Sequence, residues 1–177
     1  EKVYNLNEID YFYSPHIKPW QLSTLSVFNI FKERLINSNH HRHIYSDKIL
    51  AVSHPWYNKG RILNEAKNLP KWIMNEIAFK FEKFGRKFEC GRKIFIDRRE
   101  SNYNHCQIIN DEEIKTHLKK KGFVVYKVGE LDFFKQIYLF QNANIIIGAH
   151  GAAFTNLIFC KPNTKVFDII PKNHPNT

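Results

Sequence analysis

Four short apolar runs in the second half of the chain predict buried β-strands. They are Lys93–Asp97 (KIFID), Phe123–Val128 (FVVYKV), Ile145–Gly148 (IIIG) and Val166–Ile170 (VFDII). The runs are continuous rather than alternating between apolar and polar positions, as is typical of strands that helices cover on both faces.

Three helical segments are expected between and around these strands. The first has a cap at Asn110, a glutamate three residues later (Glu113) that can reach back, and a staple of Ile109 against Ile114. It ends in three lysines followed by Gly122, which suits the negative end of a helix dipole.

The second helix is expected to begin near Asp132 and to bury Phe133, Ile137 and Phe140 on one side. The third begins just after Gly151. Strands that alternate with helices predict an α/β fold, with a Rossmann-like parallel sheet and helices on both faces.

The first half of the chain predicts fewer elements. A helix starting near Pro70 and ending at Gly85, an earlier helix over about residues 20–35, and a strand at Lys48–Val52 are expected. We interpret residues 1–90 as the end of an N-terminal lobe with a crossing helix, and residues 91–177 as an incomplete Rossmann-like domain. Because the chain has no initiator Met, we expect it to be part of a longer protein.

Composition and charge narrow the class of protein. Aromatic residues make up 15% of the chain, which favours a packed interior over disorder. The net charge is +10, with 14 basic against 9 acidic residues in 1–91 and 13 against 8 in 92–177. Because the positive charge is spread evenly, we expect a mild positive field that attracts any polyanion, and no basic arm. No recognition helix or stacking motif is visible, so we expect no nucleic-acid partner.

Three cysteines without a C-x-x-C pair suit a reducing compartment, so a cytoplasmic location is expected. No apolar run reaches the roughly 18 residues of a membrane span. The positive field leaves peripheral association with an anionic membrane surface open.

The segment Asn144–Phe159 (NIIIGAHGAAFTNLIF) carries the clearest chemistry. A buried strand runs into a turn of small residues around His150, and a helix follows at once. Small residues let a ligand approach the backbone, and the first N–H groups of a helix favour an anion. The alternative is a tight turn in which Gly151 serves geometry and His150 is merely hydrogen-bonded.

Five blocks follow one another over roughly Arg92–Pro171: IDR, NDEE, GFVV, LDFFKQI and IIIGAHGAAFTNLIF. Their order resembles glycosyltransferase family 61, the group that includes bacterial capsular-polysaccharide enzymes, and a weaker likeness extends upstream. The resemblance implies a GT-B-like fold, a nucleotide-sugar donor (often UDP-linked), a glycan or polysaccharide acceptor, and inversion at the anomeric carbon. Family members often carry an Arg where this chain has Cys106 and Gln107, and many have Gly at the position of Ala153.

No metal cofactor is expected. Glycosyl transfer develops negative charge on the departing diphosphate, and many enzymes offset it with a metal held by an Asp-x-Asp pair. The six aspartates of this chain contain no such pair. Cations and a helix N-terminus would have to take that role.

Arg98 is the candidate for gripping the diphosphate, with a salt bridge to Glu100 or Glu113 as the alternative. His150 is the one candidate for catalytic base. Nucleotide contacts are further expected from the backbone of Gly151 and Ala152 and from the side chains of Asn110, Glu113, Gln136 and Asn156. For Gln136 the alternative is a backbone hydrogen bond, and for Asn156 a tie within the loop.

Two other interpretations stay open. His40, His41 and His43 lie in a polar loop without a supporting carboxylate, so we expect an exposed loop rather than a metal site. The alternative function for the whole chain is a non-catalytic α/β module that binds nucleotides or polyanions.

Overall fold

The computed structural model describes residues 4–15, 18–52, 69–98 and 106–172. The chain divides into two compact units, Glu1–Lys80 and Phe81–Thr177. The boundary falls inside helix α3 (Lys71–Phe81), upstream of the boundary that we placed after residue 90.

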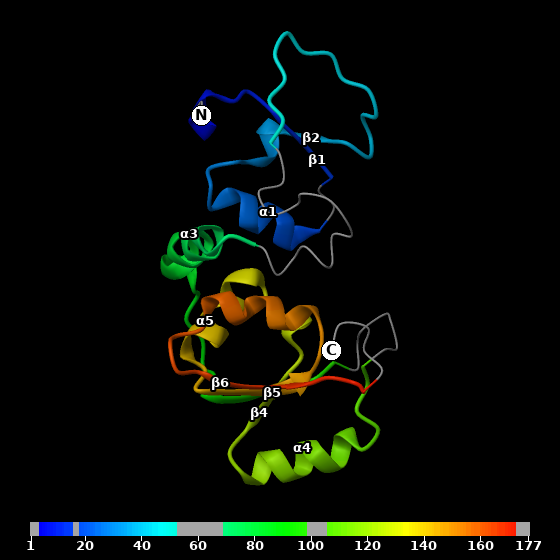
Figure 1. Cartoon of the computed structure of the whole chain (residues 1–177), viewed down its shortest axis with the longest axis vertical. Coiled ribbons are helices and arrows are strands. Elements are labelled where there is room, and N and C mark those ends of the chain that lie inside the picture. Colours follow the sequence, from blue (N-terminus) through cyan, green and yellow to red (C-terminus); the bar gives the residue numbers. More distant parts are fainter. Residues whose placement is uncertain (1–3, 16–17, 53–68, 99–105, 173–177) are drawn as a thin grey trace. The chain divides into compact units, whose positions relative to one another are not determined.

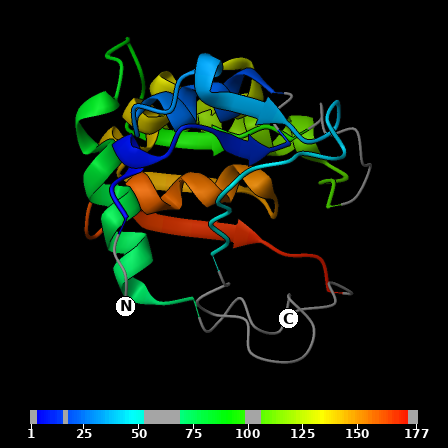
Figure 2. The same cartoon turned by 90° about the horizontal axis from the view of Figure 1, so that it is seen from above.

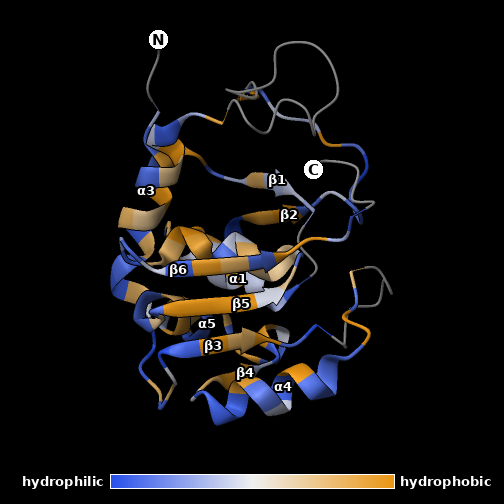
Figure 3. Ribbon diagram, turned by 60° about the horizontal axis from the view of Figure 1, so that its bottom comes forward, coloured by the Kyte–Doolittle hydropathy of each residue, from blue (hydrophilic) through white to orange (hydrophobic). Residues whose placement is uncertain are grey.

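The second unit is built on a four-stranded parallel sheet. Its strands are β3 (Lys93–Ile96), β4 (Val124–Tyr126), β5 (Ile145–Ala149) and β6 (Lys165–Ile169). They lie in the order β4-β3-β5-β6, and every neighbouring pair is parallel (Figure 3). The four predicted strands and their parallel pairing are confirmed.

The most deeply buried residues of the sheet lie in its two central strands, β3 and β5. Ile94, Phe95 and Ile96 of β3 and Ile146 of β5 are at most 2% exposed. Strand β5 is coloured strongly hydrophobic in Figure 3. Strand β6, drawn red in Figure 2, lies at the edge of the sheet, and all five of its residues are exposed.

Helices cover both faces of this sheet, as predicted. Helix α4 (Asp111–Lys120) lies on one face, and α5 (Phe133–Asn142) lies on the other with the 3-10 helix η6 (Ala152–Phe159) beside it (Figure 1). A short 3-10 helix, η5 (Val128–Glu130), leads from β4 toward α5. The two central strands are therefore closed off from solvent on both sides.

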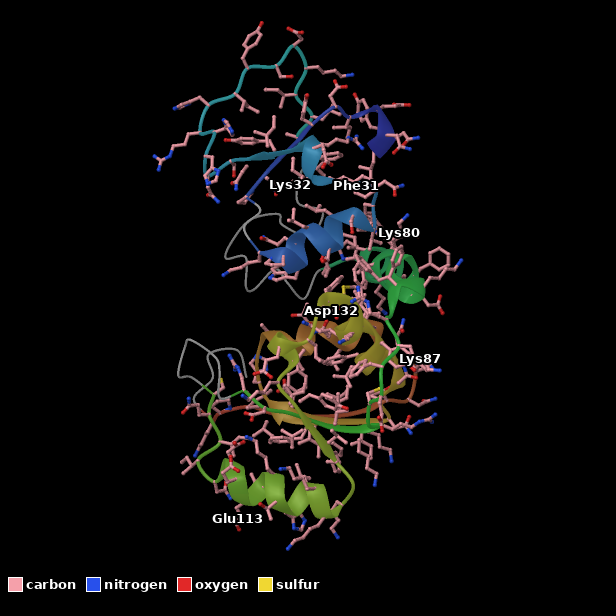
Figure 4. All side chains as sticks on the ribbon, turned by 180° about the vertical axis from the view of Figure 1, so that it is seen from behind. Phe31, Lys32, Lys80, Lys87, Glu113 and Asp132 are labelled. Carbon is pink, nitrogen blue, oxygen red and sulfur yellow. The ribbon has the colours of Figure 1, made fainter. Side chains whose placement is uncertain are left out.

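Helix α5 begins where the sequence predicts. The Asp132 carboxylate, labelled in Figure 4, accepts hydrogen bonds from the backbone N–H groups of Phe134 and Lys135 at 3.1 and 3.2 Å. This is an N-cap that satisfies two otherwise unpaired donors. The helix buries Ile137 and Phe140 completely.

The start of α4 differs from the prediction. The Asn110 side chain accepts no capping bond from the backbone, because its backbone ψ of 40° is far from the extended conformation of a typical cap. Its amide instead donates to Glu113 Oε2 at 3.2 Å. Ile109 is fully exposed, so the predicted staple with Ile114 is wrong. The end is as predicted: Gly122 adopts a φ of 81°, and its N–H donates to Lys119 O at 2.9 Å.

An aromatic cluster lies at the start of the second unit, around Phe81. Phe81 is 2% exposed, and its ring lies 5.5 Å from that of Phe133 and 5.9 Å from that of Phe159. Phe84, in the 3-10 helix η4 (Glu82–Phe84), stacks on Phe134 at 6.2 Å. Aromatic pairs at such separations pack favourably beyond the area that they bury.

The first unit contains a parallel pair that we did not predict. Strands β1 (Phe12–Ser14) and β2 (Leu35–Asn37) are joined through α1 (Pro19–Ser26), and the 3-10 helices η1 (Leu6–Glu8) and η2 (Lys32–Arg34) flank the strands.

Two predictions for this unit are wrong. The helix expected over residues 20–35 ends at Ser26, because Asn29 takes a left-handed φ of 58° and breaks the helical path. The strand expected at Lys48–Val52 does not form, and Val52 is 93% exposed. No neighbouring strand pairs with that apolar run among the described residues.

Candidate functional site

Two central strands bring Arg98 and the His150 turn together. Arg98 lies two residues beyond β3 and His150 directly follows β5, and these strands pair in register up to Ile96 opposite Gly148. Nη1 of Arg98 donates a hydrogen bond to the carbonyl oxygen of His150. We expected these residues to share one site at the carboxyl ends of the strands, and the coordinates place them in contact.

Gly151 is where the guanidinium of Arg98 rests. A Cβ built at Gly151 would lie 2.6 Å from Nε of Arg98, closer than such atoms approach. The backbone of Gly151 is extended, with φ 166°, so any residue could adopt it. Glycine is needed here for room, because the arginine side chain occupies the space that a Cβ would take.

Gly148 lets the two strands pack closely beneath the site. A Cβ at this position would lie 2.9 Å from Cβ of Ile96. The smaller residue therefore keeps the carboxyl ends of β3 and β5 adjacent, which holds Arg98 next to the turn.

The site sits where the order of the strands reverses. From β3 the chain moves to β4 on one side, and then crosses to β5 and β6 on the other side. The switch point therefore lies between β3 and β5, whose ends carry Arg98 and His150. In open α/β sheets this crevice is the usual place for ligands.

The ring of His150 is held by a carboxylate on the neighbouring strand. Nδ1 of His150 lies 2.7 Å from Oδ2 of Asp168 in β6, and the two side chains are 37% and 28% exposed. The backbone N–H of His150 also donates to Ile169 O at 3.0 Å. From the sequence we expected Asp168, which lies inside a strand, to meet only the N-terminus of a neighbouring helix. The position of Asp168 near the end of the last strand becomes informative only once β6 is known to pair with β5.

A buried lysine fixes the segment just before Arg98. Lys115 of α4 is 3% exposed, and its Nζ lies 2.6 Å from Oδ2 of Asp97 and also pairs with Asp111. This cluster joins the end of β3 to the first turns of α4. We did not anticipate it, although Lys115 falls between Ile114 and Leu118 on the apolar side of the predicted helix.

Next to Arg98 lies a cavity of about 310 Å³. Ile96, Arg98 and Ala149 line it from the sheet, and residues 106–113 line it from the start of α4. Asn110 and Glu113 are therefore near Arg98, and Figure 4 shows Glu113 close to the N-terminal end of α4. Glu113 bonds to Asn110 and forms no ion pair with Arg98 in the described part of the chain, and Glu100, the other alternative partner, lies outside the described residues.

Gln136 and Asn156 contact each other rather than Arg98. Nε2 of Gln136 donates to Leu131 O at 2.9 Å, and its Oε1 accepts from Nδ2 of Asn156 at 3.1 Å. Asn156 also donates to Ala153 O at 3.2 Å. The hydrogen bond from Gln136 to a backbone carbonyl is the alternative that the sequence offers for this residue. The side chain of Asn156 links η6 to α5 through its bond to Gln136.

The helix after the turn is of the 3-10 type along its whole length. The N–H of Phe154 donates to Gly151 O at 2.9 Å, three residues back. Ala152, at its first position, is exposed. The tighter pattern gives poorer bond geometry than the α-helix that we expected.

Other candidate chemistry is limited. Burial raises the pKa of the Cys160 thiol to about 11, so it stays protonated at neutral pH. In the parts of the chain that the structure describes, no group of three or more His, Cys, Asp or Glu residues is arranged to hold a metal, and no helix is long and apolar enough to cross a membrane.

A parallel sheet with helices on both faces and a reversal of the strand order places this unit in the class of Rossmann-like α/β domains. Within that class, the family model described as Glycosyltransferase 61 matches residues 9–167. The chain therefore belongs to glycosyltransferase family 61, which confirms the resemblance found in its sequence.

Named relatives agree with this family. The chain is 32% identical over 77 residues to a beta-1,2-xylosyltransferase of Arabidopsis thaliana, covering 36% of this chain and 14% of that protein. It is 33% identical over 82 residues to an EGF domain-specific O-linked N-acetylglucosamine transferase of Gallus gallus, covering 44% of this chain and 15% of that protein. The Bos taurus protein of the same name is 32% identical over 84 residues, covering 45% of this chain and 16% of that protein. The matches thus span a small part of each relative.

Proposed function

We propose that this chain binds the donor of a glycosyltransferase reaction, in which a sugar passes from a nucleotide sugar, with UDP as the nucleotide, to a glycan or polysaccharide acceptor. The relatives are named for the transfer of xylose and of N-acetylglucosamine, and this supports sugar transfer as the general reaction. We further propose that the reaction inverts the anomeric carbon, and that the fold is GT-B-like.

The observation that carries the proposal is the guanidinium of Arg98 at the switch point, against His150 and Gly151. A guanidinium holds five N–H donors in a planar fork, which suits the paired oxygens of a diphosphate. The negative charge that develops on the leaving diphosphate would be stabilised there. This gives Arg98 the role of binding the leaving group.

We propose that donor binding needs no divalent metal. The sequence contains no Asp-x-Asp pair, so the cation at the diphosphate would be Arg98. The backbone of Gly151 and Ala152 would add donors, and the side chains of Asn110 and Glu113, which line the cavity, would contact the nucleoside.

Calorimetric titration of UDP into the 177-residue chain tests the proposal. Binding is expected to be equal with magnesium and with EDTA. Arg98→Ala should weaken it by about 1.5–3 kcal/mol, the range for hydrogen bonds to charged groups, while the circular dichroism spectrum stays unchanged. Arg92→Ala, an exposed arginine at the opposite end of β3, is the matched control. Binding only with metal, or unchanged binding by Arg98→Ala, would refute these assignments.

The second candidate function is a non-catalytic module for nucleotides or polyanions, which the even positive charge favours. Hydrolysis or transfer of a UDP-sugar separates the two functions. A module would bind UDP and heparin with a steep dependence on salt and would release no sugar.

A further inference from the structure

Asp168 and His150 share one face of the sheet because of the register of β5 and β6. Gly148 lies opposite Asp168, and Ala149 lies opposite Ile169. Side chains alternate along a strand, so residues 148 and 150 point to the same side as residue 168. The bond from the N–H of His150 to Ile169 O extends the pairing by one residue and fixes the backbone of His150.

The contact decides which nitrogen of His150 carries the proton. An ionised carboxylate only accepts hydrogen bonds, so Nδ1, at 2.7 Å from Oδ2 of Asp168, must be the donor. In the neutral ring the lone pair then lies on Nε2. The charged groups at His150 include Asp168 at the ring and Arg98 at the carbonyl oxygen.

We propose that Asp168 is a positioning residue for His150 in sugar transfer. This inference rests on the proposed function. The O–H bond of the acceptor breaks and its proton passes to Nε2 of His150, while the acceptor oxygen forms a bond to the anomeric carbon of the donor. The bond from that carbon to the diphosphate oxygen breaks, and its electron pair leaves with UDP.

Asp168 takes no proton in this step. Its carboxylate holds the ring in the Nδ1–H form and offsets the positive charge that the ring gains. Arg98, which donates to the carbonyl oxygen of His150, serves the leaving diphosphate. The three strands β3, β5 and β6 thus supply separate parts of one reaction.

If the pair of His150 and Asp168 had only a structural role, its loss would be expected to affect folding rather than turnover. Both side chains are about one-third exposed, and exposed ion pairs contribute little to stability. Loss of the carboxylate should therefore affect turnover far more than folding or UDP affinity.

The first experiment measures turnover of a UDP-sugar and binding of UDP in five variants of the chain, one of them a double variant. Asp168→Asn should lower kcat by about 100-fold or more, within the usual contribution of general base catalysis, with the Kd for UDP nearly unchanged. Asp168→Glu should restore part of the loss. When His150 is already replaced by glutamine, adding Asp168→Asn should lower kcat no further, because the two residues act as one unit. Asp47→Asn, an exposed aspartate of the first unit, is the matched control.

The second experiment needs no turnover. Nitrogen-15 NMR of the imidazole rings should show His150 protonated on Nδ1 at pH 8 in the native chain, and mixed between the two nitrogens in Asp168→Asn. Native-like Nδ1 protonation in Asp168→Asn, or equal falls in kcat and UDP affinity, overturns the role of Asp168. The predicted tautomer without any turnover by the native chain would instead refute the proposed function and with it the catalytic use of this pair.

Discussion

At the scale of single residues, the position of Arg98 depends on a buried charge cluster. Lys115 reaches from α4 to Asp97, the residue immediately before Arg98, and to Asp111. A buried ion pair costs desolvation, so such a cluster is poor evidence for net stability. Removing the lysine is nevertheless strongly destabilising, because the remaining carboxylates would stay buried without a counter-charge.

Lys115→Met should lower the free energy of unfolding by about 3–5 kcal/mol, the cost of leaving one side of a buried pair uncompensated. Methionine keeps most of the volume, so the loss reports charge rather than packing. Urea denaturation followed by circular dichroism measures it. Lys119→Met, on an exposed turn of the same helix, should stay within about 0.5 kcal/mol of the native chain. Equal stability of both variants would show that the cluster is dispensable.

The sequence predicts which residues end up near the site better than it predicts their partners. Arg98 and His150 follow predicted strands, so their meeting at one edge could be foreseen. The pairing of His150 with Asp168, and of Lys115 with Asp97, could not. Each depends on which strand or helix lies beside which, and a local pattern carries no such information.

At the scale of elements, the turn between β5 and η6 is shaped by an arginine from another strand. Gly151 has an extended backbone but no space for a side chain, because the Arg98 guanidinium lies against it. The residue that this turn can carry at position 151 is therefore set by Arg98, which follows β3, and not by the turn alone.

Gly151→Ala should displace the guanidinium without straining the backbone. UDP affinity is expected to fall by about tenfold or more, equivalent to the weakening of one hydrogen bond to a charged group. Titration calorimetry measures the change. Gly129→Ala is the matched control, because a Cβ there meets nothing within 4 Å and the position lies in η5. If the two variants bind UDP alike, the contact of Arg98 with Gly151 has no part in binding.

The elements that could be predicted are those with a strong local signal. Buried strands β3 and β5 and the Asp132 cap of α5 follow from apolar runs and one capping residue. The run at Lys48–Val52 looks equally apolar, yet it forms no strand and Val52 lies in solvent. A strand needs a partner, and apolar composition alone does not supply one.

At the scale of the whole molecule, the candidate site belongs to one unit. Arg98, His150, Asp168 and the cavity all lie within Phe81–Thr177. The unit begins at Phe81, whose ring packs on Phe133 and Phe159.

A fragment of residues 81–177 is therefore expected to fold and to bind UDP with the affinity of the whole chain. A fragment of residues 82–177 is the control. It lacks Phe81, and burial of one large aromatic ring is worth about 1.5–3 kcal/mol, so it should melt at a lower temperature. Thermal unfolding and UDP titration of both fragments measure this. Loss of UDP binding in a folded 81–177 fragment would place part of the donor site in residues 1–80.

The order of the sheet could not be read from the sequence. Alternating strands and helices predict that the strands are parallel, but β4-β3-β5-β6 is one of several orders with the same alternation. The switch point between β3 and β5 follows from that order. The likeness to glycosyltransferase family 61 depended instead on the succession of motifs along the chain.

The bond from Arg98 to the His150 carbonyl also bears on the entropy of binding. A surface arginine usually loses rotational freedom when an anion arrives, at about 0.5–1.5 kcal/mol for each such side chain. The guanidinium of Arg98 is already confined by His150 and Gly151. That loss is incurred when the chain folds, so an arriving diphosphate meets a preorganised cation and keeps more of the energy of its own contacts.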